Sequence, residues 1–253
     1  MTDAAGLDTV LGKAVTILRA FRPDDRAVAL AELVRRTGLH KATVHRLTGA
    51  LVDNRLLDRV EGGYRPSGGL FELGMLAAPE RSLLEVATPF LQDLYERTHE
   101  TVHLGVREGH DVVYVAKIGG HDQARSPSRA GGRMPMHCTA IGKALLAHAD
   151  DELRNEVLAG PLERRTPRTV VAPGILRRQL RQTVETGVAF EREESTVGLM
   201  CVAAPVLGPD HEALAAISVA GPTGRFRPER FATHVRAAAT GLGITLTRHD
   251  PPH

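Results

Sequence analysis

The chain has 253 residues, 42% of them hydrophobic and 25% charged, which is ordinary for a globular protein of one or two domains. A formal net charge of only +2 argues against wholesale coating of nucleic acid, and two cysteines make no disulfide framework. No signal peptide is recognisable and no apolar run approaches the roughly 20 residues of a spanning helix, so we expect a cytoplasmic protein without a membrane partner.

Three apolar stripes at helical spacing occupy the first part of the chain. One lies within residues 10–21, a second within residues 30–34, and the third consists of Val44, Leu47 and Leu51. Thr37-Gly38 separates the second stripe from the third, and Gly is the usual residue just past a helix end. Two short helices joined by a tight glycine-containing turn predict a helix-turn-helix.

The segment "LLDRVEGGYRP" predicts two short strands around the turn Glu61-Gly62-Gly63. Three helices followed by a hairpin indicate a winged helix-turn-helix domain over residues 1–67. The helix from about Lys41 would be its recognition helix, and the hairpin would be the wing.

The outer face of the recognition helix combines small residues with hydrogen-bond donors. Ala42 and Gly49 would allow close approach to a partner, and His45 and Arg46 would reach past them, although an ordinary solvated helix with a chance Arg has the same pattern. Residues 35–65 hold seven basic and three acidic residues, which suits phosphate contact. The side chains expected to contact DNA are Lys41, Thr43, His45, Arg46, Tyr64 and Arg65.

A linker helix over residues 68–81 and a second domain over residues 82–253 complete the predicted organisation. In chain order, the second domain has a helix ending near residue 97, the strands "TVHLGV" and "DVVYVAKI", and a polar loop from Gly119 to Arg133. The helices "TAIGKALLAH" and "ILRRQLRQTVETG", three more strands and a last helix over about 227–247 follow. Antiparallel strands with helices on their faces predict an α+β module that can hold a small ligand.

Three kinds of site are conceivable in this second domain. Free N–H groups at the helix start near Ala140 would bind a carboxylate, unless Thr139 simply caps an ordinary helix. Cys201 with His103 or His137 could serve as a nucleophile and base, but no surrounding motif supports catalysis, so we expect no catalytic residues. The same residue types could bind zinc, but their spacing matches no known finger, so neither a metal nor another cofactor is expected.

Blocks of sequence over nearly the whole chain resemble the isocitrate-lyase-regulator (IclR) family of bacterial transcription regulators. The blocks are "LGKAVTIL", "AELVRRTGLHKATVHRLTGAL", "GGYRPSGGLFELG", "MPMHCTAIGKALLA", "GVAFEREESTVGLMCVAAPV" and "AAISVAGPTGRF". The resemblance implies an N-terminal DNA-binding domain, a C-terminal GAF-like effector-binding domain, and a homodimer or dimer of dimers bound to double-stranded DNA.

The resemblance also implies an effector pocket. The backbone of Ala140 and Ile141 would bind the effector, Glu191 and Cys201 would face it, and Met134 and Leu199 would be apolar walls. No Arg or Lys is among these residues, so we expect a small monocarboxylate, with Thr139 and Ser195 as hydroxyl donors and Glu191 accepting from a ligand hydroxyl. The function predicted is a ligand-responsive regulator that binds a near-palindromic operator as a dimer and responds to a small organic acid or aromatic metabolite. The alternatives are a regulator with a metal-bound or ligand-free sensor domain, an architectural DNA-binding protein, and an enzyme with an accessory helix-turn-helix.

Overall fold

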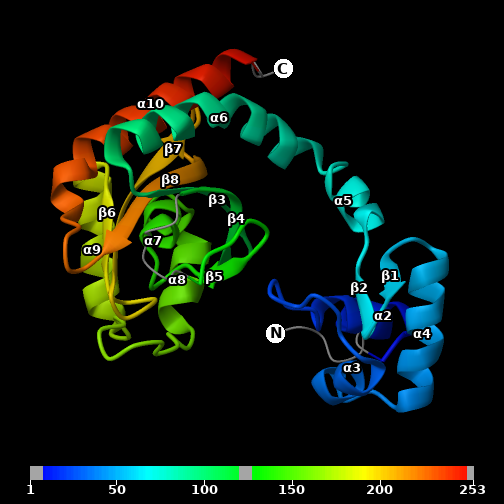
Figure 1. The fold of residues 1–253 in the computed structure, drawn as a ribbon. Helices are drawn as coiled ribbons and strands as arrows, with labels where there is room; N and C mark the ends of the chain where they lie inside the picture. Colours follow the sequence, from blue (N-terminus) through cyan, green and yellow to red (C-terminus); the bar gives the residue numbers. More distant parts are fainter. Residues whose placement is uncertain (1–7, 120–126, 250–253) are drawn as a thin grey trace. The chain divides into compact units, whose positions relative to one another are not determined.

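The computed structural model describes residues 8–119 and 127–249, and the chain divides into two compact units, Met1–Arg81 and Ser82–His253 (Figure 1). This division falls at the end of the predicted linker. Within the described residues, no helix is long and apolar enough to cross a membrane.

The first unit is a winged helix-turn-helix, as the sequence predicted. Its elements are α2 (Val10–Arg19), α3 (Leu30–Thr37), α4 (Lys41–Asp53), β1 (Leu57–Val60), β2 (Gly63–Pro66) and α5 (Gly68–Gly74). Helix α3 ends at Gly38, whose φ of 70° lets the chain turn directly into α4. Strands β1 and β2 pair antiparallel, with Val60 opposite Gly63.

The wing is joined to the helices through backbone pairing with Val28. The N–H of Val28 donates to the carbonyl of Tyr64 at 2.8 Å, and the N–H of Tyr64 donates back at 3.0 Å. A Cβ on Gly63 would lie 2.2 Å from the Val28 carbonyl oxygen, so this pairing requires a glycine. The core beneath consists of Ile17, Val28, Leu33, Val44, Leu47, Leu51, Leu57 and Tyr64.

The linker is divided between two helices. Helix α5 ends at Gly74, and α6 (Ala78–Thr98) begins after three intervening residues and continues into the second unit. Apolar side chains around α5 are open to solvent; Phe71 is 72% exposed and Leu76 is 74% exposed. A solvated linker does not need such residues, so they are candidates for a protein contact.

A six-stranded antiparallel sheet within the described residues is the centre of the second unit, in the order β5-β4-β3-β8-β7-β6. The strands are β3 (Thr101–Glu108), β4 (Asp111–Ile118), β5 (Arg133–Pro135), β6 (Ala189–Arg192), β7 (Leu199–Leu207) and β8 (Ala213–Pro222). The helices are α7 (Ala140–Ala147), α8 (Asp151–Ala159), α9 (Pro173–Thr186), the 3-10 helix η1 (Pro228–Phe231) and α10 (Ala232–His249).

The sheet separates two hydrophobic cores. Helices α6 and α10 cover one face, and α7, α8 and α9 lie on the other (Figure 1). Strand β5 and helix α8 were not predicted from the sequence, and part of the predicted loop from Gly119 to Arg133 lies outside the described residues. The α7 side of the sheet contains the cavity described below.

Candidate functional site

Helix α4 presents the predicted polar face to solvent. Val44, Leu47 and Leu51 are buried against the rest of the first unit. On the opposite side Lys41, His45 and Arg46 are exposed, and Thr43 is half-buried. The helix therefore has the arrangement that a recognition helix requires.

The basic side chains of this face have no partner inside the part of the protein that the structure describes. Neither Lys41 nor Arg46 has a hydrogen bond or ion pair there. By contrast, Arg36 of the preceding helix is held by Asp25 at 2.5 Å and by Glu32 at 2.7 Å. The charges of α4 are thus available to an external anion, whereas those of α3 stabilise the fold.

The structure of the wing differs from the prediction at Tyr64. Tyr64 was expected to contact DNA, but its side chain is only 7% exposed and packs in the core of the first unit. Its backbone pairing with Val28 turns the ring inward, because successive side chains of a strand point to opposite faces. The neighbouring Arg65 points outward and forms an exposed 3.1 Å ion pair with Asp58.

A narrow cavity of about 10 Å³ lies between the sheet and the start of α7. The structure brings all six predicted effector residues to its wall: Met134, Ala140, Ile141, Glu191, Leu199 and Cys201. The sequence prediction omitted other wall residues, namely His103, Tyr114, Pro127, Ser128 and Ser218. Every strand of the sheet contributes to the wall.

The first backbone N–H groups of α7 face this cavity. Thr139 caps the helix, because its hydroxyl accepts from the N–H of Gly142 at 3.1 Å and its carbonyl accepts from Lys143 at 2.9 Å. The N–H groups of Ala140 and Ile141 have no hydrogen-bond partner among the described residues, and both residues are buried. Buried, unpaired N–H groups at a helix start favour an anionic acceptor.

Glycines bring this helix start against the sheet. A Cβ on Gly142 would lie 2.3 Å from the Cα of Met136, so only glycine allows α7 to begin so close to the preceding segment. A Cβ on Gly105 in β3 would lie 2.9 Å from Cγ2 of Ile141. The close approach places the free N–H groups at the cavity rather than in solvent.

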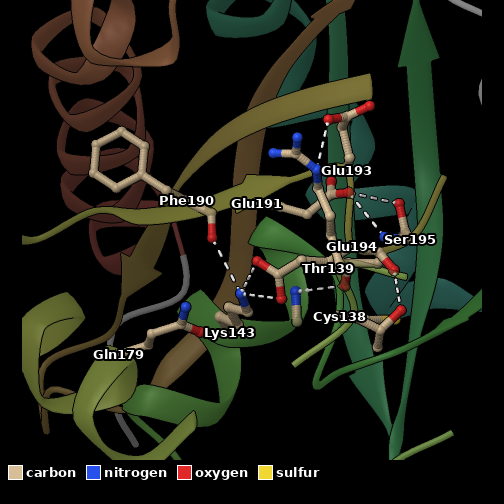
Figure 2. A network of polar contacts seen from close by, with 12 residues as sticks. Cys138, Thr139, Lys143, Gln179, Phe190, Glu191, Glu193, Glu194 and Ser195 are labelled. Carbon is tan, nitrogen blue, oxygen red and sulfur yellow. Dashed lines mark hydrogen bonds and ion pairs between the residues drawn. The ribbon is translucent and has the colours of Figure 1, made fainter. Parts of the chain in front are cut away.

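Glu191 is deeply buried, at 1% exposure, and is not the solvated carboxylate that its strand position alone would allow. Its Oε1 accepts from the N–H of Ser195 at 3.0 Å and from the Ser195 hydroxyl at 2.9 Å (Figure 2). Its cross-strand neighbour on β7 is Cys201, which also belongs to the cavity wall. Burial raises the pKa of Glu191, which favours its uncharged form.

The predicted hydroxyl donors are already engaged. The Ser195 hydroxyl donates to Glu191, and the Thr139 hydroxyl donates to the carbonyl of Pro135 at 3.0 Å while it caps α7. Both residues line the cavity, and the expectation that their hydroxyls bind the effector stays a prediction. The backbone N–H groups of Ala140 and Ile141 are the donors that remain at the start of α7.

A buried ion pair lies beside the cavity. Lys143 of α7 is 1% exposed, and its ammonium donates to both carboxylate oxygens of Glu194 at 2.6 and 2.7 Å (Figure 2). It also donates to the carbonyl of Phe190 at 3.3 Å, and the Glu194 carbonyl accepts from Thr169 at 2.7 Å. The positive charge of Lys143 is thus compensated internally and is not offered to a ligand.

His103 organises the opposite wall. Its Nε2 is hydrogen-bonded to the Ser128 hydroxyl at 2.7 Å, and its Nδ1 lies 3.4 Å from the Ser218 hydroxyl. Burial lowers the pKa of His103 to about 3, so the ring is uncharged at neutral pH. Its inward position follows from strand alternation, but only the sheet order shows that it faces the same cavity as Glu191.

Catalytic and metal chemistry find no support in this arrangement. Burial raises the pKa of Cys138 to about 12 and raises that of Cys201, so neither thiol is an activated nucleophile. His137 Nε2 is hydrogen-bonded to the Glu163 carbonyl at 3.0 Å. Across residues 8–119 and 127–249, no three His, Cys, Asp or Glu side chains are grouped to hold a metal ion.

A winged helix-turn-helix followed by a cavity-bearing α+β domain defines a class of DNA-binding regulators with a ligand-binding domain. Residues 10–61 match the IclR helix-turn-helix domain, and residues 75–243 match the bacterial transcriptional regulator IclR C-terminal domain. The chain therefore belongs to the IclR family, and it is a DNA-binding transcription regulator rather than an enzyme.

Relatives cover nearly the whole chain. The HTH-type transcriptional regulator XynR of Escherichia coli K12 is 33% identical, over 93% of this chain and 94% of its own. The transcriptional repressor IclR of the same strain is 32% identical, over 90% and 85%. An IclR homologue from Microbacterium hydrocarbonoxydans, solved in complex with 4-hydroxybenzoate, is 30% identical, with a TM-score of 0.87 over 96% of this chain and 100% of its own.

Proposed function

We propose that this regulator binds a near-palindromic operator as a dimer and that a small monocarboxylate controls its occupancy. The observation that carries the effector assignment is the pair of buried, unpaired N–H groups of Ala140 and Ile141 at the cavity. They match one carboxylate, and the described wall residues include no Lys or Arg for a second. The complex of the Microbacterium homologue with 4-hydroxybenzoate supports the same class of ligand.

The DNA contacts follow from the exposed face of α4. His45 and Arg46 are directed to base edges, and Lys41 and Thr43 lie nearer the phosphate backbone. One such module reads only a few base pairs, and each mismatch costs about 1–3 kcal/mol, so genomic specificity calls for two copies. The exposed apolar residues Leu11, Phe71 and Leu76 support a homodimer, which a dimer of dimers would extend.

The effector acts by shifting the equilibrium between two arrangements of the protein. A ligand changes operator occupancy only by its difference in affinity between two arrangements of the protein, and a few kcal/mol are sufficient. A carboxylate bound at the start of α7 can produce an affinity difference of this size, because a hydrogen bond to a charged group contributes about 1.5–3 kcal/mol.

Ala140→Pro should remove one of the two donors and leave the helix intact. Pro is favoured at the first helical position, and Thr139, with φ −118° and ψ 146°, already has the conformation that a residue before Pro prefers. We expect 4-hydroxybenzoate, the probe chosen from the homologue's ligand, to bind on the order of 10–100-fold more weakly in calorimetry. DNA footprints without ligand should stay unchanged.

The matched control is Asp151→Pro. It places Pro at the first position of α8, after the capping residue Asp150 and away from the cavity wall. Its affinity for 4-hydroxybenzoate should equal that of the wild type. If Ala140→Pro keeps full affinity while its thermal unfolding is unchanged, the carboxylate does not bind at α7. If 4-hydroxybenzoate, benzoate, lactate and propionate all fail to bind the wild type, the assignment to a monocarboxylate is wrong.

Arg65→Ala tests the wing. Arg65 is exposed on the wing, and we expect it to contact a DNA phosphate. Such a contact adds affinity without sequence preference. Binding to operator and to unrelated DNA should weaken to a similar extent, and the slope of log affinity against log salt should fall by about one unit for each wing. An unchanged slope in titrations from low to moderate salt would mean that the wing does not contact DNA.

A further inference from the structure

A second polar group of the cavity wall has no hydrogen bond within the described residues: the hydroxyl of Tyr114. Tyr114 lies on β4, opposite Gly105 of β3, and its side chain belongs to the cavity wall. The residue is 6% exposed, and its ring packs edge-on against His103 with a centroid distance of 5.2 Å. Its hydroxyl makes no hydrogen bond among residues 8–119 and 127–249, and its oxygen is not one of the fully buried polar atoms without a partner, which are His148 Nε2 and Gln179 Oε1.

The other polar side chains of the wall are satisfied within the protein. His103 is hydrogen-bonded to Ser128 and lies near Ser218, and the Ser195 hydroxyl donates to Glu191. The Thr139 hydroxyl is used by Pro135 and Gly142. The hydroxyl of a tyrosine in a binding site is well suited to a hydrogen bond with a partner. Two groups of the described cavity wall are thus free to bind a partner from outside the chain: the N–H groups at the start of α7 and the Tyr114 hydroxyl.

The partner at Tyr114 is expected to be uncharged. No Lys or Arg is among the described wall residues, so a second carboxylate would be buried there without a described cation to compensate its charge. The nearby Lys143 is occupied by Glu194. A hydroxyl or carbonyl group can exchange a hydrogen bond with a phenol without bringing a charge into this buried site.

We propose that Tyr114 is a specificity-determining residue, and that its hydroxyl selects monocarboxylates carrying a second, uncharged oxygen group, a hydroxyl or a carbonyl. This inference rests on the proposed carboxylate site at α7 and adds the second point of recognition. A ligand with both groups satisfies both unpaired sites, whereas the parent acid without the oxygen leaves Tyr114 unpaired.

The test uses pairs of acids in which one acid carries an additional hydroxyl. Each pair is titrated against the wild type and against variants that lack one tyrosine hydroxyl. The full-length wild type, Tyr114→Phe and Tyr95→Phe are titrated by calorimetry with 4-hydroxybenzoate and benzoate, and with lactate and propionate. Tyr95→Phe is the matched control, because Tyr95 lies on α6 and is not part of the cavity wall. The melting temperature of each variant shows that it is folded.

In at least one pair, the wild type should bind the hydroxylated acid about tenfold more tightly, the order expected for one neutral hydrogen bond. Tyr114→Phe should reduce this ratio to about one and leave the affinity for the parent acid unchanged, and Tyr95→Phe should keep the wild-type ratio. Equal binding of both acids by the wild type, or a ratio retained in Tyr114→Phe, overturns the inference while the carboxylate site stands. If no acid of either pair binds the wild type, both proposals fall together.

Discussion

Arg46→Ala should abolish operator-specific binding and leave the protein folded. Arg46 is exposed on α4 and has no ion pair or hydrogen bond within the described residues, so its loss removes nothing that stabilises the first unit. A good base contact by an Arg contributes about 1–3 kcal/mol of discrimination, and a dimer loses it twice. Footprinting on the operator and on unrelated DNA measures specific and non-specific binding together, and thermal unfolding checks the fold.

Arg177→Ala provides the comparison for this variant. Arg177 is an exposed Arg on α9 of the second unit, so the substitution makes the same change in charge away from α4. We expect its footprint to match that of the wild type. Wild-type specificity in Arg46→Ala would show that α4 does not read the operator, and equal losses in both variants would show that net charge alone is responsible.

Lys143→Met should destabilise the second unit by about 3–5 kcal/mol, because it leaves the Glu194 carboxylate buried without its counterion. Both side chains lie beside the cavity, and Glu194 adjoins Ser195, the hydrogen-bond partner of Glu191. Denaturant unfolding of the full chain measures the effect. The affinity for 4-hydroxybenzoate should fall together with the stability of the second unit. The Lys143–Glu194 pair joins α7, which bears the proposed carboxylate site, to the segment after β6.

Two further variants separate the charge effect from a packing effect. Lys143→Met combined with Glu194→Leu removes both charges, and it should recover most of the lost stability, since replacing a whole buried pair by apolar residues is often neutral. Arg97→Ala breaks the exposed 2.7 Å pair between Arg97 and Asp93 of α6, which should cost at most about 1 kcal/mol. If the double variant is as unstable as Lys143→Met, lost packing rather than an unpaired charge is the cause.

The DNA-binding half of the molecule could be predicted from local patterns. The stripe of Val44, Leu47 and Leu51 predicted which face of α4 is buried, and this also identified His45 and Arg46 as exposed. The turn at Gly38 and the hairpin after Glu61 depend on residues a few positions apart. Both are properties of short segments, so no knowledge of the rest of the chain was needed.

The cavity was predicted through family resemblance rather than from spacing. Its wall combines residues of all six strands with the start of α7, and these segments are spread over more than one hundred residues of the chain. Periodicity indicates which side chains share a face of one strand, but the order β5-β4-β3-β8-β7-β6 is decided by pairing between distant strands. For this reason His103 and Tyr114 were missed as wall residues.

Local periodicity and motifs were sufficient to predict the class of fold, the buried face of α4 and the resemblance to the family. Which polar groups are already paired depends on the tertiary structure. Tyr64 turns inward because its strand pairs with Val28, and the Ser195 and Thr139 hydroxyls are engaged by Glu191 and Pro135. The N–H groups of Ala140 and Ile141 and the hydroxyl of Tyr114 have no partner among the described residues, since pairing in a buried site depends on neighbours that the fold brings together from distant parts of the chain.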